Sequence, residues 1–140
     1  MSATDITTAI SHVSVVTVRV KDQDAALRFY TESLGFEKRD DVPMGETMRW
    51  LTVAPVGSPT VISLFNGEEQ GGAPLGGATG LVLETDNIDT AHRELSGRGV
   101  RFTKEPAREF FGGWAEWYHP TKPWRTRDGD RNGSHAASYR

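Results

Sequence analysis

Residues 20–36 read VKDQDAALRFYTESLGF, and this stretch decides the fold. It predicts the end of a strand, a helix over about residues 23–34, and the start of another strand. Asp22 can accept hydrogen bonds from the first free N–H groups of the helix. Apolar residues recur at helical spacing, so that one face of the helix is apolar. Gly35 then supplies the left-handed residue that ends the helix.

A fainter copy of this stretch follows 64 residues later. Asp86 or Asn87 can cap a second helix, and Gly99-Val100 repeats the glycine and the strand start. Strands are predicted at about residues 13–20, 36–42, 47–54 and 60–65, and again at about 81–85, 100–103 and 114–118. The first half therefore reads βαβββ and the second βαββ. Two such units must bury their sheet faces together, because neither covers its own core.

The chain after His119-Pro120 differs from the rest. Residues 124–140 contain four arginines and almost no aliphatic side chains, so we predict no strand there and an eighth strand is doubtful. Genuine divergence and a frame change in the gene both explain such a tail. We expect a single domain over 1–140, with module one at 11–66, a Gly-rich linker at 67–79, module two at 80–120 and an irregular basic tail at 121–140.

Composition limits the classes of function. The 140 residues carry a net charge of −3, which gives no reason to expect nucleic acid or a membrane surface as partner. The absence of cysteine excludes disulfides and thiolate zinc sites. No apolar run approaches the ~18 residues of a membrane span, and no signal pattern opens the chain. A cytoplasmic protein is the expectation.

The pattern V-x-D-x-x-x-A-L-x-F-Y-x-x-x-L-G-F at residues 20–36, with its partial repeat, resembles the vicinal oxygen chelate superfamily. That group includes glyoxalase I, bleomycin-resistance proteins and extradiol dioxygenases, and the resemblance covers about residues 11–118. It implies an α+β fold of two βαβββ modules whose sheets curve into a cup around a ligand or metal. It also implies a homodimer.

The resemblance further implies metal ligands at four positions. Enzymatic members have a histidine where this chain has Val15, a glutamate where it has Ser63, and a histidine near Gly80 or Leu81. Their fourth ligand, a glutamate on the eighth strand, has no recognisable counterpart here. We therefore predict no metal site and no cofactor, while a divalent metal on unrecognised ligands stays open.

Candidate ligand-binding residues follow from the same register. The residues predicted to line the cup are Val15, Thr17, Trp50, Ser63, Phe65 and Trp114. Core packing is the commoner role of such residues. A pocket built from them would be apolar with a few hydroxyls, which suits a flat or aromatic small molecule.

Two functions follow, from different classes. The first is a glyoxalase/bleomycin-resistance-like protein that lacks the metal ligands and binds a small apolar or aromatic molecule in the cup. The second is a lyase, isomerase or dioxygenase-type enzyme that uses unrecognised metal ligands or Glu116 as general base. Glu116 lies between Trp114 and Tyr118 at strand spacing, so its direction decides whether it could act there. An altered member without activity is a third reading.

Overall fold

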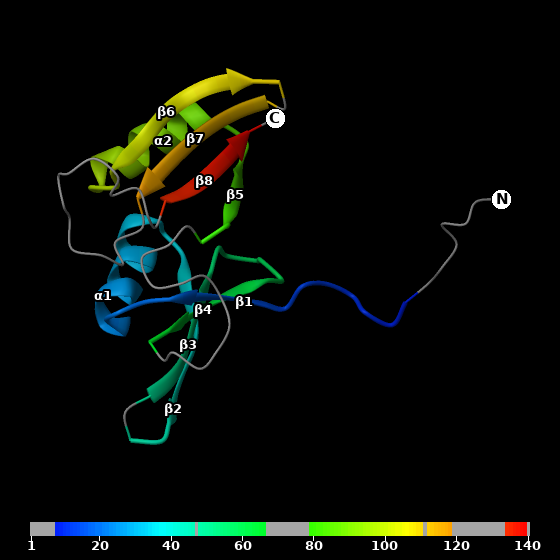
Figure 1. Ribbon diagram of the computed structural model, residues 1–140, viewed down its shortest axis with the longest axis vertical. Helices are drawn as coiled ribbons and strands as arrows, with labels where there is room; N and C mark the ends of the chain where they lie inside the picture. Colours follow the sequence, from blue (N-terminus) through cyan, green and yellow to red (C-terminus); the bar gives the residue numbers. More distant parts are fainter. Residues whose placement is uncertain (1–7, 47, 67–78, 111, 119–133, 140) are drawn as a thin grey trace.

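The computed structural model describes residues 8–46, 48–66, 79–110, 112–118 and 134–139, the last range by its backbone alone. The chain forms two modules, one above the other in Figure 1. Residues 8–14 run outward from the lower module toward the N-terminus. Within the described residues, no helix is long and apolar enough to cross a membrane.

Module one contains β1 (Val15–Arg19), α1 (Gln23–Arg28), a π-helical turn η1 (Phe29–Ser33), β2 (Glu37–Met44), β3 (Met48–Ala54) and β4 (Val61–Phe65). Its four strands form one sheet in the order β1-β4-β3-β2. The first strand runs parallel to β4, and the other pairs are antiparallel.

Module two contains β5 (Val82–Thr85), α2 (Ile88–Gly97), β6 (Phe102–Glu109), β7 (Gly112–Tyr118) and β8 (Ser134–Tyr139). The sheet order β5-β8-β7-β6 repeats that of module one, again with a parallel pair at one edge. The predicted α+β fold of two βαβββ modules is confirmed.

The prediction that no strand follows His119-Pro120 was wrong. The backbone of β8 pairs in parallel with β5 and antiparallel with β7, so it is an inner strand of its sheet. Hydrogen bonds in a sheet join main-chain groups, and β5 and β7 both have main-chain N–H and C=O groups that face the position between them. A short segment of weak strand propensity can therefore pair at this position, here Ser-His-Ala-Ala-Ser-Tyr. The glycine-rich segment 67–78 and residues 119–133 lie outside the described residues.

Strand β6 also runs further than predicted. It continues through Pro106 to Glu109, and its register against β7 shifts between Lys104 and Ala107. Because β6 is an edge strand, a proline there breaks no pairing on the outer side.

Both helices begin at a side-chain cap. Asp22 Oδ1 accepts a hydrogen bond from the Ala25 N–H at 3.1 Å. In module two the cap is Asn87, whose Oδ1 accepts from the Thr90 N–H at 3.0 Å. Of the two residues that the sequence offered, Asn87 and not Asp86 therefore caps α2.

The core of module one lies between α1 and one face of its sheet. Tyr30 and Ala26 pack there against Val20, which follows β1, and against strand residues, namely Val18, Leu51, Val53, Ile62 and Leu64. Tyr30 is completely buried, and this burial raises the pKa of its hydroxyl.

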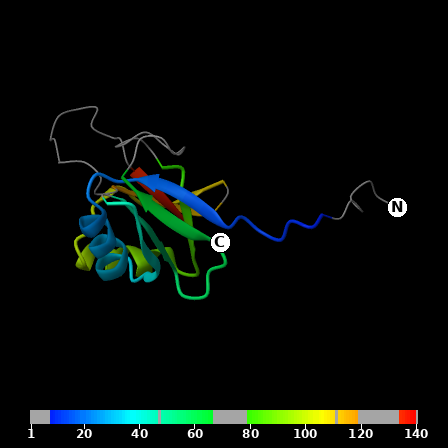
Figure 2. The same cartoon turned by 90° about the horizontal axis from the view of Figure 1, so that it is seen from below.

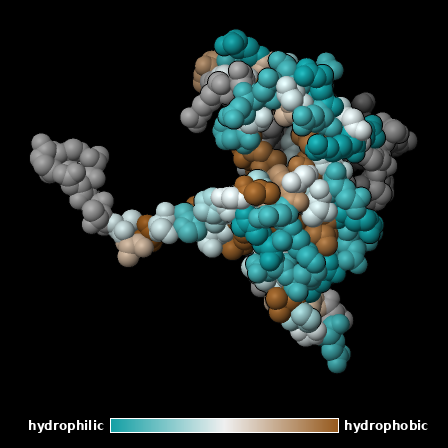
Figure 3. Space-filling model, turned by 180° about the vertical axis from the view of Figure 1, so that it is seen from behind, coloured by the Kyte–Doolittle hydropathy of each residue, from teal (hydrophilic) through white to brown (hydrophobic). Residues whose placement is uncertain are grey.

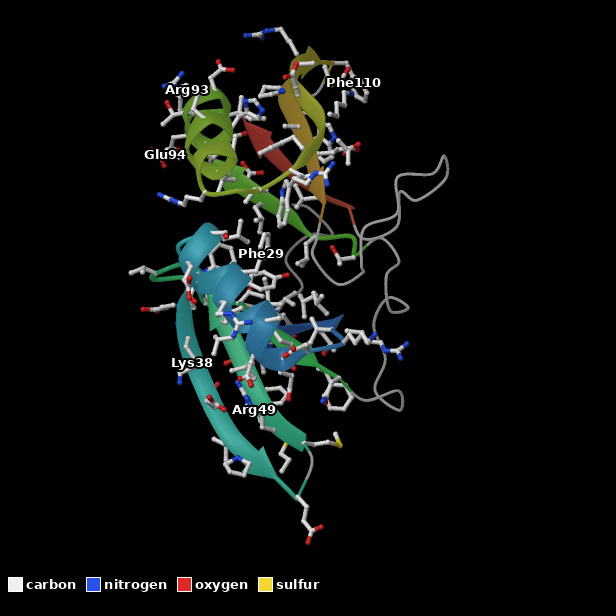
Figure 4. All side chains as sticks on the ribbon, turned by 90° about the vertical axis from the view of Figure 1, so that its left-hand side faces the viewer. Phe29, Lys38, Arg49, Arg93, Glu94 and Phe110 are labelled. Atoms are coloured by element: carbon white, nitrogen blue, oxygen red, sulfur yellow. The ribbon has the colours of Figure 1, made fainter. Side chains whose placement is uncertain are left out.

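The two modules meet near the ends of their helices. The rings of Phe29 and Trp117 lie 5.7 Å apart between centroids, and Phe29 is seen at this junction in Figure 4. Arg98 Nη1 donates a hydrogen bond to the Ser33 carbonyl oxygen at 3.2 Å. Figure 2 shows both helices close together at one side of the molecule.

Candidate ligand-binding face

The predicted site residues of module one lie on the face of its sheet opposite α1. Side chains alternate along a strand, and the alternate residues Val18, Ile62 and Leu64 pack toward α1. The opposite face, called here the non-helical face, carries Val15, Thr17 and Arg19 from β1, Trp50 and Thr52 from β3, and Ser63 and Phe65 from β4. All five candidates from module one are therefore brought onto one surface.

A row of hydroxyl groups crosses this face. Thr17 pairs with Ser63 across the parallel strands, and Ser63 pairs with Thr52 across the antiparallel ones. Thr52 Oγ1 donates to Asp40 Oδ2 at 2.9 Å and accepts from the Asp40 N–H at 3.0 Å. Ser63 and Thr52 are buried, while Thr17 is half-buried. The row therefore runs from buried residues in the middle of the sheet to a half-buried residue on the edge strand β1.

An aromatic row runs beside the hydroxyl row. Continuing the β3–β4 register by two residues places Trp50 opposite Phe65. Arg19 pairs with Phe65 from the other side, and Val42 pairs with Trp50. Phe65 is buried, but Trp50 and Arg19 are half-buried and flank it. An accessible indole thus lies next to hydrogen-bonding groups, a combination that suits a flat molecule with polar edges.

Trp114 and Glu116 belong to the other sheet. Ala115 and Trp117 of β7 are completely buried, so the alternate residues Trp114 and Glu116 point away from that packed side. Trp114 Nε1 donates a hydrogen bond to Glu116 Oε1 at 3.2 Å. Both side chains are half-buried. They occupy in module two the face that corresponds to the non-helical face of module one.

The residues at the family's metal-ligand positions do not fit a metal centre. Val15 cannot coordinate a cation, Ser63 offers a neutral hydroxyl, and Leu81 is aliphatic. Strand β8 contains no carboxylate residue, and His135 is its one residue of a common ligand type. Among the described residues, no group of three or more His, Asp or Glu side chains could hold a metal ion. We therefore derive no chemistry through a metal.

Sequence reasoning missed three residues of the face, Thr52, Asp40 and Arg19. The two hydrogen bonds between Thr52 and Asp40 depend on a register shift between Lys38 and Asp40, which no local pattern reveals. Arg19 follows from the same alternation as Thr17, so the signal for it was present in the strand itself.

Comparison with known proteins defines the class of protein. The model of the Glyoxalase/Bleomycin resistance protein/Dioxygenase superfamily matches residues 9–130, and the chain belongs to this superfamily. A superfamily member from Sphaerobacter thermophilus DSM 20745 has a crystal structure that matches with a TM-score of 0.78 and 34% identity, over 94% of this chain and 98% of that one.

Two further relatives are similar to this chain. TnmS3, described as an antibiotic binding protein from Streptomyces sp. CB03234, matches with a TM-score of 0.78 and 32% identity over 95% of this chain and 98% of its own. The uncharacterized protein YurT of Bacillus subtilis (strain 168) is 36% identical over 104 residues, which are 69% of this chain and 81% of YurT.

Proposed function

We propose that this protein binds a small aromatic molecule on the non-helical face of module one. The observation that carries the proposal is the pair of adjacent rows, in which the half-buried Trp50 flanks Phe65 and a row of hydroxyls runs alongside. The likeness to TnmS3, an antibiotic binding protein, supports a small-molecule ligand.

Each part of the face has a distinct physical role in this proposal. The Trp50 ring stacks on the ligand, and such aromatic contacts contribute about 0.5–1.5 kcal/mol beyond the burial of area. The Thr17 hydroxyl hydrogen-bonds a polar edge of the ligand, and the Arg19 guanidinium can lie over a ring or bind a carbonyl oxygen. Binding here needs neither a metal nor a catalytic group.

A homodimer would complete the site. Strands β1 and β5 are edge strands of their sheets, and Val15 and Val82 on them are exposed, by 37% and 51%. A second copy that covers these residues would bury apolar area and would close the side of the face that β1 borders.

The proposal is tested with two substitutions and a matched control. Planar aromatic antibiotics are screened by thermal shift, since a ligand selective for the folded state must raise the melting temperature. For a hit, Trp50→Leu should weaken binding by roughly 3- to 10-fold, the equivalent of one stacking contact. Thr17→Val, which removes one hydroxyl at nearly constant volume, should weaken it by a similar factor.

The control is Phe110→Leu, which removes a fully exposed aromatic ring from module two. It should leave the dissociation constant within about twofold, the usual effect of a distant surface change. The proposal is wrong if no compound in the screen raises the melting temperature, or if both site variants bind a hit as tightly as the control does.

A further inference from the structure

A cavity of about 620 Å³ lies between the two modules. Its walls are largely apolar and come from both halves of the chain, with Leu34, Phe36 and Ile62 on one side and Leu83, Leu95 and Trp117 on the other. Figure 3 shows hydrophobic side chains gathered in the hollow between the upper and lower parts. Its volume lies within the ~300–1,000 Å³ typical of small-molecule sites.

The cavity is separate from the non-helical face. Its lining residues Val16 and Ile62 are the immediate neighbours of Thr17 and Ser63, and they point to the opposite side of the sheet. Among the described residues, none of the six predicted ligand-binding residues lines it. A molecule bound between the modules would therefore leave the non-helical face unoccupied.

Two of the residues that line the cavity, Trp117 and Arg98, also make contacts that join the two modules. The Phe29 and Trp117 rings pack together at the junction, and Arg98 donates to the Ser33 carbonyl. Both contacts join a residue of module one to a residue of module two. The cavity is therefore framed by specific contacts at the module junction.

The apolar walls limit what the cavity can take. Three charged residues, Glu84, Glu94 and Arg98, also line it, and Arg98 Nη2 lies 3.9 Å from Glu94 Oε2, so these two opposite charges offset one another. Because the rest of the lining is largely apolar, a charged ligand would lose its hydration there without gaining equivalent contacts. An uncharged ligand would not carry this cost.

We propose that this cavity is a second binding site, which takes an uncharged apolar small molecule. Because both modules supply its walls, the bound molecule ties them together and stabilises the folded chain by an amount that rises with the logarithm of its concentration above the dissociation constant. The proposal does not depend on binding at the non-helical face.

The test uses two fluorescent probes with one skeleton. N-phenyl-1-naphthylamine is uncharged, and 8-anilino-1-naphthalenesulfonate adds a single sulfonate to the same ring system. The uncharged probe should bind the full chain at least tenfold more tightly. The sulfonate should bind less tightly because the walls of the cavity are largely apolar. An equal or higher affinity for the sulfonate probe would contradict this account of the site.

A filling substitution locates the uncharged probe. Ala91 lies on α2 and lines the cavity. The larger side chain of the Ala91→Trp variant should therefore fill part of the cavity and weaken binding of the probe by at least tenfold. Arg93→Trp adds the same side chain to an exposed position of α2, and it should change binding by less than twofold. Ala91→Leu repeats the test with a smaller side chain in case the tryptophan prevents folding.

The result that overturns the proposal is equally specific. If folded Ala91→Trp or Ala91→Leu protein binds the uncharged probe like the wild type, the cavity is not its site. If Trp50→Leu abolishes the binding instead, the probe occupies the non-helical face, which would support the proposed function and refute the second site. Loss in the Ala91 variants with retention in Trp50→Leu is the expected result.

Discussion

Replacing Gln23 tests how α1 is attached to the sheet that presents the non-helical face. Gln23 is the first residue of α1, and its side chain is almost fully buried. Its Nε2 donates to the Arg49 carbonyl oxygen of β3 at 3.1 Å and to the Leu64 carbonyl oxygen of β4 at 2.8 Å. One amide group therefore joins the helix to two strands, β3 and β4, and uses both of its hydrogens.

The expected loss follows from these two bonds. Gln23→Met keeps a side chain of similar length and removes both donors. Each hydrogen bond has a net value of about 0.5–1.5 kcal/mol, so the free energy of unfolding should fall by about 1–3 kcal/mol. The free energy of unfolding of the Gln23→Glu variant at pH 7 should be lower still, because this variant places a carboxylate against two carbonyl oxygens in a buried position.

The pH dependence of the Gln23→Glu variant separates this account from a simple packing effect. Burial beside carbonyl oxygens should raise the pKa of the new carboxyl above its ordinary value of about 4.3 in the folded state. At a pH below this raised pKa, the carboxyl of the folded protein is neutral and can donate one hydrogen bond. Relative to Gln23→Met, the variant should therefore be more stable at pH 4 than at pH 7, and it should lose this advantage as the pH rises through the raised pKa.

Urea unfolding followed by circular dichroism, at pH 4 and pH 7, measures these differences, with Lys21→Met as an exposed neighbouring control. The control should stay within about 0.5 kcal/mol of the wild type. A Gln23→Met variant that also stays within that range would refute the role of the two bonds. So would a Gln23→Glu variant whose stability relative to Gln23→Met is the same at both pH values.

Two further predictions concern the caps and the core. Asn87→Ala should lower the free energy of unfolding by about 1 kcal/mol and Asp86→Ala by much less, because Asn87 and not Asp86 caps α2. Equal losses for the two variants in thermal or urea unfolding would contradict this assignment of the cap. Burial raises the pKa of the Tyr30 hydroxyl, so above about pH 10 this hydroxyl loses its proton in the unfolded chain but keeps it in the folded chain. This difference should lower the free energy of unfolding of the wild type by about 1.4 kcal/mol per pH unit. Tyr30→Phe should remove that part of the alkaline slope, and an unchanged slope between pH 10 and 11.5 in urea unfolding would show that Tyr30 is not its source.

Much of the fold could be predicted because it depends on local patterns. The cap at Asp22, the apolar helix face that carries Tyr30 and the glycine at Gly35 each act within a few residues of one another. Their partial repeat predicted the second module and the family. The register implied by the family resemblance also predicted Thr17, Ser63 and Phe65 on one face, and the pairing of β1 with β4 places them there.

Two features could not be predicted from local patterns, for different reasons. Strand β8 was missed because its sequence is weakly strand-like, and its place is set by main-chain groups of β5 and β7 far away in the chain. The choice of Asn87 over Asp86 depended on where α2 begins, a matter of one residue.

By itself, the sequence determined the two modules, their helices and the alternation of side chains along the strands with a clear pattern. Caps, glycine turns and alternation depend on interactions between residues that are close in the chain. Only the tertiary structure decided which strands are neighbours, and therefore that Thr17, Ser63 and Thr52 form one hydroxyl row with Asp40 at its end. It also decided that Leu34 and Leu83, from different modules, line one cavity. Pairing of residues that are distant in the chain depends on register and on packing between modules, and neither is encoded within a single segment.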